Sequence, residues 1–372
     1  ATFDISATAL FLDEFSESMI SKAMLVSGAV GILMTMLYAR LQNKINFSTL
    51  ILLNISFITL ITILIWLSFL FTSGKWIIFT VFVFLGPLNI IALTGFWGVA
   101  VRLFTLRQGK RLFGLIDSGQ ILGIIIISFA VPLLMIFLVE TSHLLIISSV
   151  SIGAALVTQI IINRKFNLNE AREKEAAETE TKETKLLSLF KNRYVRNISF
   201  FAVLSMVTAF FIWYSFLATA KQQYPEKENM TTFLALFFAT VNIFILLFKT
   251  FVFSRIVKNY GINVSLMIMP VLLAVFTVFA VVVGSIFGYS PEMGNFIFFF
   301  LIIAMSRLFN LSLKSSIEVP SIKILYQSIE KKIRFRVQAA IDGVVNEFSA
   351  LFAGLVLMIL SFIDSFVLIH YS

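Results

Sequence analysis

Four polar residues recur at helical spacing within an apolar stretch near the end of the chain. They are Gln338, Asp342, Asn346 and Ser349, separated by four, four and three residues. This spacing places all four on one face of a helix. A carboxyl group, two amides and a hydroxyl make that face too polar for lipid, so it is expected to line a polar cavity or meet a partner. Glu347 lies off this face and would need a separate partner.

A shorter version of the same face occurs at Asp117, which has Gln120 three residues further on. Arg111 precedes Asp117 by six residues, and Arg336 precedes Asp342 by six, which is about 9 Å along a helix. Two roles remain open for the two aspartates. One is an ion pair with a basic residue that gates the cytoplasmic mouth. The other is direct handling of a solute or a proton.

A cationic helical face is expected on the apolar stretch 293–313 and the residues that follow it. Arg307, Asn310 and Lys314 are spaced three and four residues apart, with Glu318 four further on. Two cations and an amide facing a cleft suit an anion, since Arg binds it through a bidentate fork and Lys as a movable point charge. In the alternative interpretation Lys314 only extends to the membrane interface. Lys249 is a further candidate for solute binding.

The composition places these charges in a membrane. Only 13% of the residues are charged and 59% are hydrophobic, against roughly 25% charged in an ordinary soluble domain. The mean hydropathy is +0.97. Most apolar stretches are long enough for helices and too long for barrel strands. The expected spans are 3–15, 20–41, 47–72, 76–104, 112–138 and 143–162, then 197–219, 230–253, 262–287, 293–313, 337–363 and a stub from 365.

The basic residues indicate the orientation. They gather in alternate connections, for example Arg40 and Lys44, so the positive-inside rule places those loops in the cytoplasm. Anionic lipid explains the net charge of +9 better than nucleic acid does, and no nucleic-acid partner is expected. We therefore expect a multi-pass protein of a bacterial inner membrane, with the charged linker and both termini in the cytoplasm.

The spans fall into two similar halves. We expect a six-helix bundle over 1–162, a charged linker over 163–196 and a second six-helix bundle over 197–372. The Arg-to-Asp motif at Arg111 returns 225 residues later at Arg336, at the start of the fifth helix of each half. The fold class is therefore all-α, a facilitator-type 6+6 arrangement of two pseudo-symmetric bundles. The second half has gained about twenty residues, 315–334, enough for about 30 Å of helix.

Several functions are excluded by residue type. The chain has no Cys and only two His, so we expect no thiol chemistry, no disulfide and no zinc site. No catalytic constellation can be assembled, and neither an enzyme nor a cofactor is expected. The first and last apolar stretches are shorter than the roughly 20 residues of a spanning helix. We therefore expect a membrane module of a longer polypeptide that can carry soluble domains, with no cleavable signal peptide.

Three motifs carry a family resemblance. They are Tyr-Ala-Arg-Leu-Gln-Asn-Lys at 38–44, Gly-Lys-Arg-Leu-Phe-Gly at 109–114, and the stretch from Lys-Ser-Ser at 314–316 through Pro320, Lys323 and Tyr326 to Ala-Ala-Ile-Asp at 339–342. The chain resembles the ATP/ADP translocases of plastids and intracellular bacteria, a branch of the major facilitator superfamily. The resemblance implies twelve helices and antiport of nucleotides or other phosphate-bearing anions. The family's Gly-Lys-Ser-Gly-Gly-like run is replaced here by Asn-Glu-Phe-Ser-Ala at 346–350.

The sequence thus predicts a secondary transporter of an anionic, nucleotide-like or phosphate-bearing solute. Arg307, Asn310, Lys314 and Lys249 are its expected binding residues. The gating or coupling residues are expected to be Asp117, Asp342, Gln338, Asn346, Arg111 and Arg336. The alternative is a non-transporting membrane sensor or scaffold module of a larger multidomain protein.

Overall fold

The computed structural model describes residues 1–71, 74–104, 106–137, 140–166, 168, 191–293, 295–329, 337–338, 341 and 345–360. Every secondary-structure element in these ranges is a helix. Long apolar runs fold this way in lipid because a helix satisfies its own backbone N–H and C=O groups where no water can. Eight of the helical stretches are long and apolar enough to cross a membrane.

The first bundle is built from six helices and one 3-10 turn. They are α1 (Thr2–Glu14), α2 (Glu17–Lys44), α3 (Phe47–Phe71), α4 (Lys75–Leu103), α5 (Leu106–Phe137), η1 (Thr141–His143) and α6 (Leu144–Lys165). α3 packs along α6 and α4, while α2 and α1 both pack on α4. The predicted spans 47–72 and 76–104 match α3 and α4 to within one residue.

The second bundle contains two π-helical segments in addition to its α-helices. Its elements are α9 (Arg193–Gln223), α10 (Lys227–Leu247), the π-helix η2 (Phe248–Val252), α11 (Phe253–Phe287), η3 (Pro291–Met293), α12 (Phe296–Leu313), the π-helix η4 (Lys314–Glu318), α13 (Val319–Tyr326) and α15 (Asn346–Leu360). α9 packs on α12 and α15, and α12 packs on α10 and α11.

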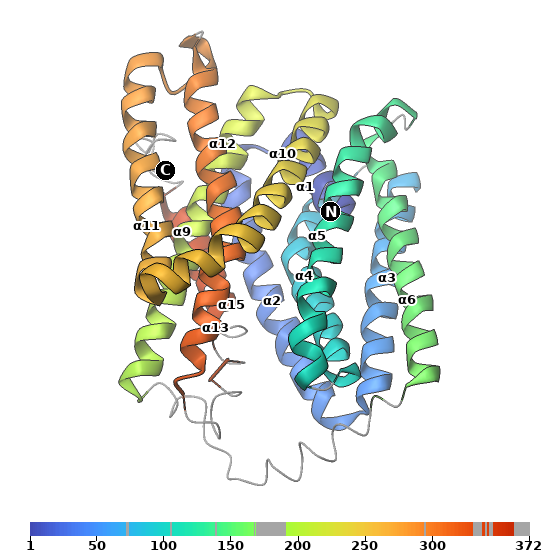
Figure 1. Ribbon diagram of the computed structural model, residues 1–372. Helices are drawn as coiled ribbons and strands as arrows, with labels where there is room; N and C mark the ends of the chain where they lie inside the picture. The colour runs from blue at the N-terminus through green and yellow to red at the C-terminus, as the bar shows by residue number, and fades with distance from the viewer. Residues whose placement is uncertain are drawn as a thin grey trace.

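Two helix pairs make the most extensive contacts between the bundles. α2 runs along α15, and α5 runs along α10 (Figure 1). In chain order α2 and α10 are the second helices of their bundles, and α5 and α15 the fifth when the contiguous α12, η4 and α13 are counted as one helix. The second helix of each bundle therefore packs on the fifth helix of the other, which is the pairing expected of the pseudo-symmetric arrangement that the internal repeat predicts.

Glycines allow α2 and α15 to approach closely. A Cβ atom on Gly28 of α2 would lie 2.8 Å from the backbone nitrogen of Leu351, and one on Gly354 of α15 would lie 2.7 Å from the Cα atom of Leu25. Small residues at such contacts let helix backbones pack where lipid supplies no hydrophobic driving force. We call this contact the α2–α15 seam.

The helices of the second bundle continue further than the predicted spans. The basic residues Arg255 and Lys258, expected in the connection 254–261, are helical and lie within α11, while the helix breaks at Gly261, the last residue of that expected connection. Gly261 has φ 80° and ψ 175°, a backbone conformation that suits glycine. Past Leu313 the helix runs on through η4 into α13, as the inserted length predicted, and the described helix there ends at Tyr326.

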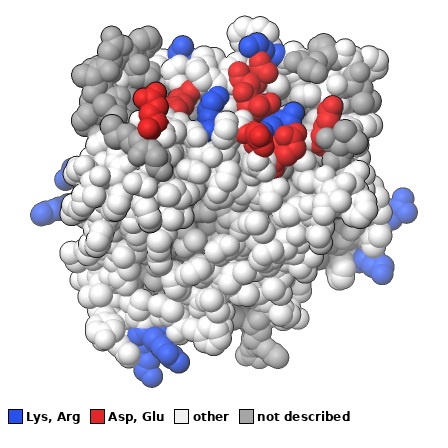
Figure 2. Space-filling model, turned by 90° about the horizontal axis from the view of Figure 1, so that it is seen from above, with Lys and Arg blue, Asp and Glu red and all other residues white. Residues whose placement is uncertain are grey.

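The two ends of the molecule differ in charge. Basic residues mark the end where α6 stops and α9 begins, among them Arg40, Lys44, Lys165 and Arg193. We call this the linker end. The opposite end, onto which Figure 2 looks, gathers acidic side chains with a few basic ones among them, and we call it the acidic end. Its carboxylates include Asp13, Glu14, Glu17, Glu140, Glu226, Glu228 and Glu292.

Candidate transport site

Arg307 of α12 is held against α9. Its Nη1 atom donates to the carbonyl oxygen of Ala209 at 3.2 Å and to Oδ1 of Asn310 at 3.3 Å. Its guanidinium carbon lies 5.8 Å from the ring centre of Trp213, within the range of a cation–π interaction. Arg307 is half-buried. One face of α9 thus fixes the direction of a cation deep within the second bundle.

Asn310 supports this arrangement from the same helix. It is fully buried, and its Oδ1 atom accepts from Arg307, while its Nδ2 atom has no hydrogen-bond partner. Asn310 therefore lies inside the protein, where it positions the guanidinium of Arg307, rather than on the surface of a cleft as its spacing suggested.

The π-helix η4 begins with a lysine and ends with a glutamate that share one serine. Lys314 Nζ lies 3.3 Å from the Ser205 hydroxyl oxygen and 2.8 Å from the sulfur of Met206. The Ser205 hydroxyl donates to Glu318 Oε1 at 2.5 Å, and Glu318 Oε2 is buried without a hydrogen-bond partner. Lys314 therefore does not extend to the interface; it is half-buried against α9 with a carboxylate beside it.

An ion pair joins the two bundles at α5 and η2. The ammonium group of Lys249, in η2, binds the carboxylate of Asp117. The sequence predicts different roles for these residues: Lys249 is expected to bind the solute, and Asp117 to act in gating or coupling. The structure brings them together, with Lys249 as the basic partner that the gating interpretation of Asp117 required.

A network of contacts closes the acidic end between the bundles, and none of its residues is among the predicted site residues. Lys221 of α9 donates to the carbonyl oxygen of Leu12 at 2.6 Å and also to that of Phe15. Gln222 donates to Glu17 at 2.7 Å, and Lys227 lies 3.9 Å from Asp13. Thr141 and Thr231 meet through their hydroxyl oxygens at 3.0 Å. We call these contacts the acidic-end network.

The network could have been found in the sequence. Asp13 and Glu17 flank the turn after the first span, and Lys221 and Lys227 flank the corresponding turn of the second half. Opposite charges at matching positions of two repeats are therefore the signal. A third lysine, Lys75, pairs with Glu14 at 2.8 Å within the first bundle.

Aromatic side chains fill the space below this network. The Phe82 ring of α4 stacks on Trp213 of α9, with centroids 5.8 Å apart. Phe11 of α1 stacks on Phe82 at 4.1 Å. The bundles are thus in contact from the acidic end down to Trp213, whose ring also faces Arg307.

The sequence pattern over most of the chain decides the family. The model of the TLC ATP/ADP transporter family matches residues 58–369. The chain belongs to this family. The match confirms the resemblance seen in the motifs, and it identifies the protein as a multi-pass membrane transporter.

A solved structure has the same fold. The chain resembles a mutant form of the nucleoside transporter NupG, with a TM-score of 0.64 over 96% of this chain and 90% of that one. The sequences are 13% identical, so this likeness concerns the fold alone. A search of curated protein sequences gave no match.

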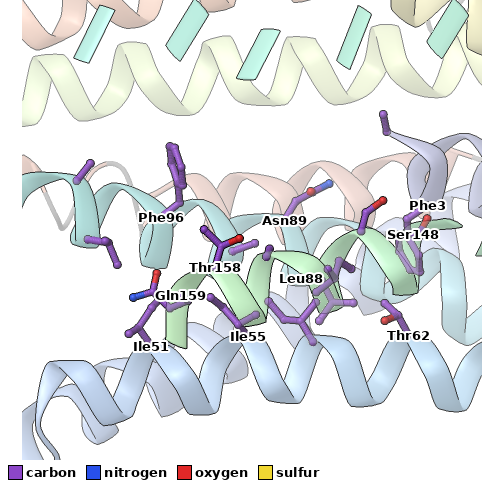
Figure 3. A pocket seen from close by; sticks show the side chains of 18 of the residues that line it. Phe3, Ile51, Ile55, Thr62, Leu88, Asn89, Phe96, Ser148, Thr158 and Gln159 are labelled. Atoms are coloured by element: carbon purple, nitrogen blue, oxygen red, sulfur yellow. The ribbon is translucent and has the colours of Figure 1, made fainter. Parts of the chain in front are cut away.

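A cavity of this TLC-family transporter lies inside its first bundle. It measures about 750 Å³ and lies among α1, α3, α4 and α6 (Figure 3). Its lining is mostly apolar, with polar side chains such as Asn89, Thr158 and Gln159, and it includes no Lys or Arg from the part of the chain that the structure describes. Asn89 donates to Asp4 Oδ1 at 3.0 Å. The face of α12, which carries Arg307, therefore suits an anionic solute better than this cavity does.

The predicted polar face near the end of the chain is described only in part. Gln338 is half-buried, and Ser349 is buried and donates to the carbonyl oxygen of Val345 at 2.6 Å. Asp342 and Arg336 lie outside the described residues, as do the side chains of Arg111 and Asn346. Their gating or coupling roles stay predictions.

Proposed function

We propose that this transporter exchanges a phosphate-bearing, nucleotide-like anion by alternating access between its two bundles. The proposal rests on the contact between Arg307 and Trp213. It lies where the aromatic contact between the bundles ends, on the side away from the acidic end. A guanidinium fork suits a phosphate group. An indole face suits a flat ring by stacking, and in this transporter the face is offered when the bundles separate and Phe82 of the first bundle leaves Trp213. The two chemistries of a nucleotide are therefore offered by two side chains in contact.

Lys314 adds a second positive charge on the same helical face as Arg307, about two turns further on. In the absence of solute, Glu318 supplies its counter-charge through Ser205. A phosphate group that reached Lys314 would compete with Glu318 for the ammonium group, and Glu318 would compete again when the solute leaves. Such competition keeps binding reversible, which a carrier needs at each turn of its cycle.

Alternating access requires contacts between the bundles that form and break. The acidic-end network and the Asp117–Lys249 pair both join the first bundle to the second. We infer that opening toward the acidic end breaks the network, and that movement between α5 and η2 breaks the pair. The positive-inside rule places the linker end in the cytoplasm, so the acidic end faces outward.

The test is exchange in proteoliposomes. Vesicles that contain the purified protein and unlabelled ATP are given labelled ATP, ADP, adenosine or inorganic phosphate outside. We expect uptake of a phosphate-bearing solute, reduced at least about 10-fold in Arg307→Ala through loss of charge-assisted hydrogen bonds worth roughly 1.5–3 kcal/mol. Arg255→Ala, on an exposed arginine of α11, serves as the matched control. Uptake of adenosine alone, or equal rates in the two variants, would contradict the proposal.

A further inference from the structure

Glu347 is a buried carboxyl group at the α2–α15 seam. It stands at the start of α15 and is 5% exposed. Its Oε1 atom is buried without a hydrogen-bond partner. None of the roles discussed above uses it. It differs in this from Asp117, which has Lys249, and from Glu318, which has Ser205 and Lys314.

Gly31 of α2 provides the space for this carboxyl group. A Cβ atom on Gly31 would lie 2.9 Å from Glu347 Cδ and would meet Oε2 as well. The carboxyl group therefore fills the position of a missing side chain on the facing helix. Because α2 belongs to the first bundle and α15 to the second, the group lies where the bundles must separate if this side of the molecule opens.

Charged groups on the neighbouring helices lie away from it. Along α2 the nearest titratable residues to Gly31 are Tyr38 and Lys22, about 10 and 13 Å along the axis. Glu347 forms no ion pair with any residue that the structure describes. The remaining titratable residues of the two helices that pack on α15 are Glu17, Arg40 and Lys44 on α2, and Arg193, Tyr194, Arg196, Tyr214 and Lys221 on α9.

We propose that Glu347 is a proton-binding site that couples solute movement to a proton. A carboxylate without a partner in a membrane protein costs several kcal/mol, so the packed seam holds the uncharged acid. When α2 and α15 separate, water reaches the carboxyl group, the O–H bond breaks and the proton passes to water. Re-forming the seam requires that a proton bind again. The coupling rests on the proposed transport, but the proton site itself does not.

The first test compares net accumulation with exchange in proteoliposomes, with labelled ATP as the probe. In the wild-type protein we expect a pH gradient across the membrane to change net accumulation several-fold. Glu347→Gln keeps the shape of the uncharged acid, so it should still exchange ATP at equal pH while accumulation no longer responds to the gradient. Glu228→Gln, on an exposed carboxylate of α10, should behave as wild type. A gradient response that persists in Glu347→Gln, or that is missing from the wild type, would overturn the coupling.

The second test needs no solute. The infrared spectrum of the purified wild-type protein near neutral pH should contain the C=O band of a protonated carboxylic acid, absent in Glu347→Gln and present in Glu228→Gln. If Glu347→Gln does not fold, exposure of the wild-type protein to a rising pH should remove the band only together with loss of the α2–α15 contact. A wild-type spectrum without this band rejects the proton site even if ATP is transported. A band without any ATP flux leaves the site in place and rejects the proposed function.

Discussion

A cation inside a membrane-spanning helix is stable only where other groups replace its water. Arg307 and Lys314 obtain these groups from α9, whose backbone carbonyl, hydroxyl and sulfur atoms lie about a hundred residues away in the chain. The helical spacing could predict that the two cations share a face, but not that the face would pack on another helix of the same bundle. The counter-charge from Glu318 follows from that packing.

Glu318→Gln should strengthen the binding of a phosphate-bearing solute. The change removes the carboxylate that competes for Lys314 and leaves the Ser205 hydroxyl an oxygen to donate to. We expect the dissociation constant for labelled ATP, measured on purified protein by filter binding, to fall by several-fold, and exchange to slow because release is hindered. Glu292→Gln, an exposed carboxylate of the acidic end, is the control. Weaker binding in Glu318→Gln would show that the carboxylate supports the site instead of competing with the anion.

The Asp117–Lys249 pair should show coupling across the bundles. Asp117→Asn and Lys249→Gln each break the pair, and the exchanged variant Asp117→Lys with Lys249→Asp restores it with the charges reversed. Because both side chains are partly exposed, a coupling of about 1 kcal/mol is expected. Thermal unfolding in detergent of the two single variants, their double variant and the exchanged variant measures it. Strict additivity of the two single changes would argue that the pair contributes nothing to holding the bundles.

At the scale of helices, contact between the bundles depends on residues without side chains. Gly28 and Gly31 of α2 and Gly354 of α15 each face atoms of the opposite helix at distances that exclude a methyl group. The glycines are visible in the sequence, but their partners are not, since a glycine in an apolar helix has no periodic signal of its own. The structure identifies these partners, because α2 packs on α15 and brings each glycine against the opposite helix.

Gly28→Ala should weaken the α2–α15 seam. The new methyl group would meet the Leu351 backbone at 2.8 Å, and overpacking of this kind costs about 1–3 kcal/mol. Gly123→Ala on α5 is the control, since nothing lies within 4 Å of its Cβ position, and the better helix propensity of alanine stabilises by up to about 1 kcal/mol. Thermal unfolding should therefore shift downward for the first variant only. Equal shifts would mean that the seam tolerates the methyl group.

The helices themselves were largely predictable, and their deviations have physical causes. The spans over α3 and α4 follow directly from unbroken apolar runs. The expected break between the spans 230–253 and 262–287 is found at Gly261, where the backbone conformation changes and after which the next helix begins. The basic residues Arg255 and Lys258 before it are helical, because exposed basic residues beyond the lipid are compatible with a continuing helix. The π-helices η2 and η4 have no sequence signal that we recognise.

At the scale of the whole molecule, charge is distributed by end and by bundle. At the acidic end the carboxylates of the first bundle face lysines of the second, as with Asp13 and Lys227. Each group is partly exposed and weak alone, but together with the Lys221 and threonine contacts they join two bodies that the proposed transport cycle requires to separate. The chain closes this end with polar contacts, which can exchange with water, above an aromatic layer that excludes it.

A covalent link at this end should stop transport. The chain has no Cys, so Thr141→Cys with Thr231→Cys introduces one pair only, at two side chains whose hydroxyl oxygens are 3.0 Å apart. Oxidation should abolish labelled ATP exchange, and a reductant should restore it. Each single cysteine variant should be insensitive to both treatments.

Formation of the link can be verified independently of transport. A protease site inserted within residues 169–190 would let the two bundles run as separate bands on a denaturing gel unless the disulfide joins them. Suppose that a sample with fully joined bands exchanges ATP as fast as the same sample after reduction. That result would show that the acidic end does not need to open.

The segments η2 and η4 place Lys249 and Lys314 on helical turns with one residue more than an α-turn. Such a turn holds a residue that α-helical hydrogen bonding would not need. Tightening it to α geometry would rotate the chain beyond it by about 100° per residue, with the hydrogen-bonded rod left continuous. The two segments touch each other, so a slip in one would be felt by the other. Lys249 and Lys314 therefore lie on segments that allow a helix to rotate about its axis, in addition to the rocking of one bundle against the other.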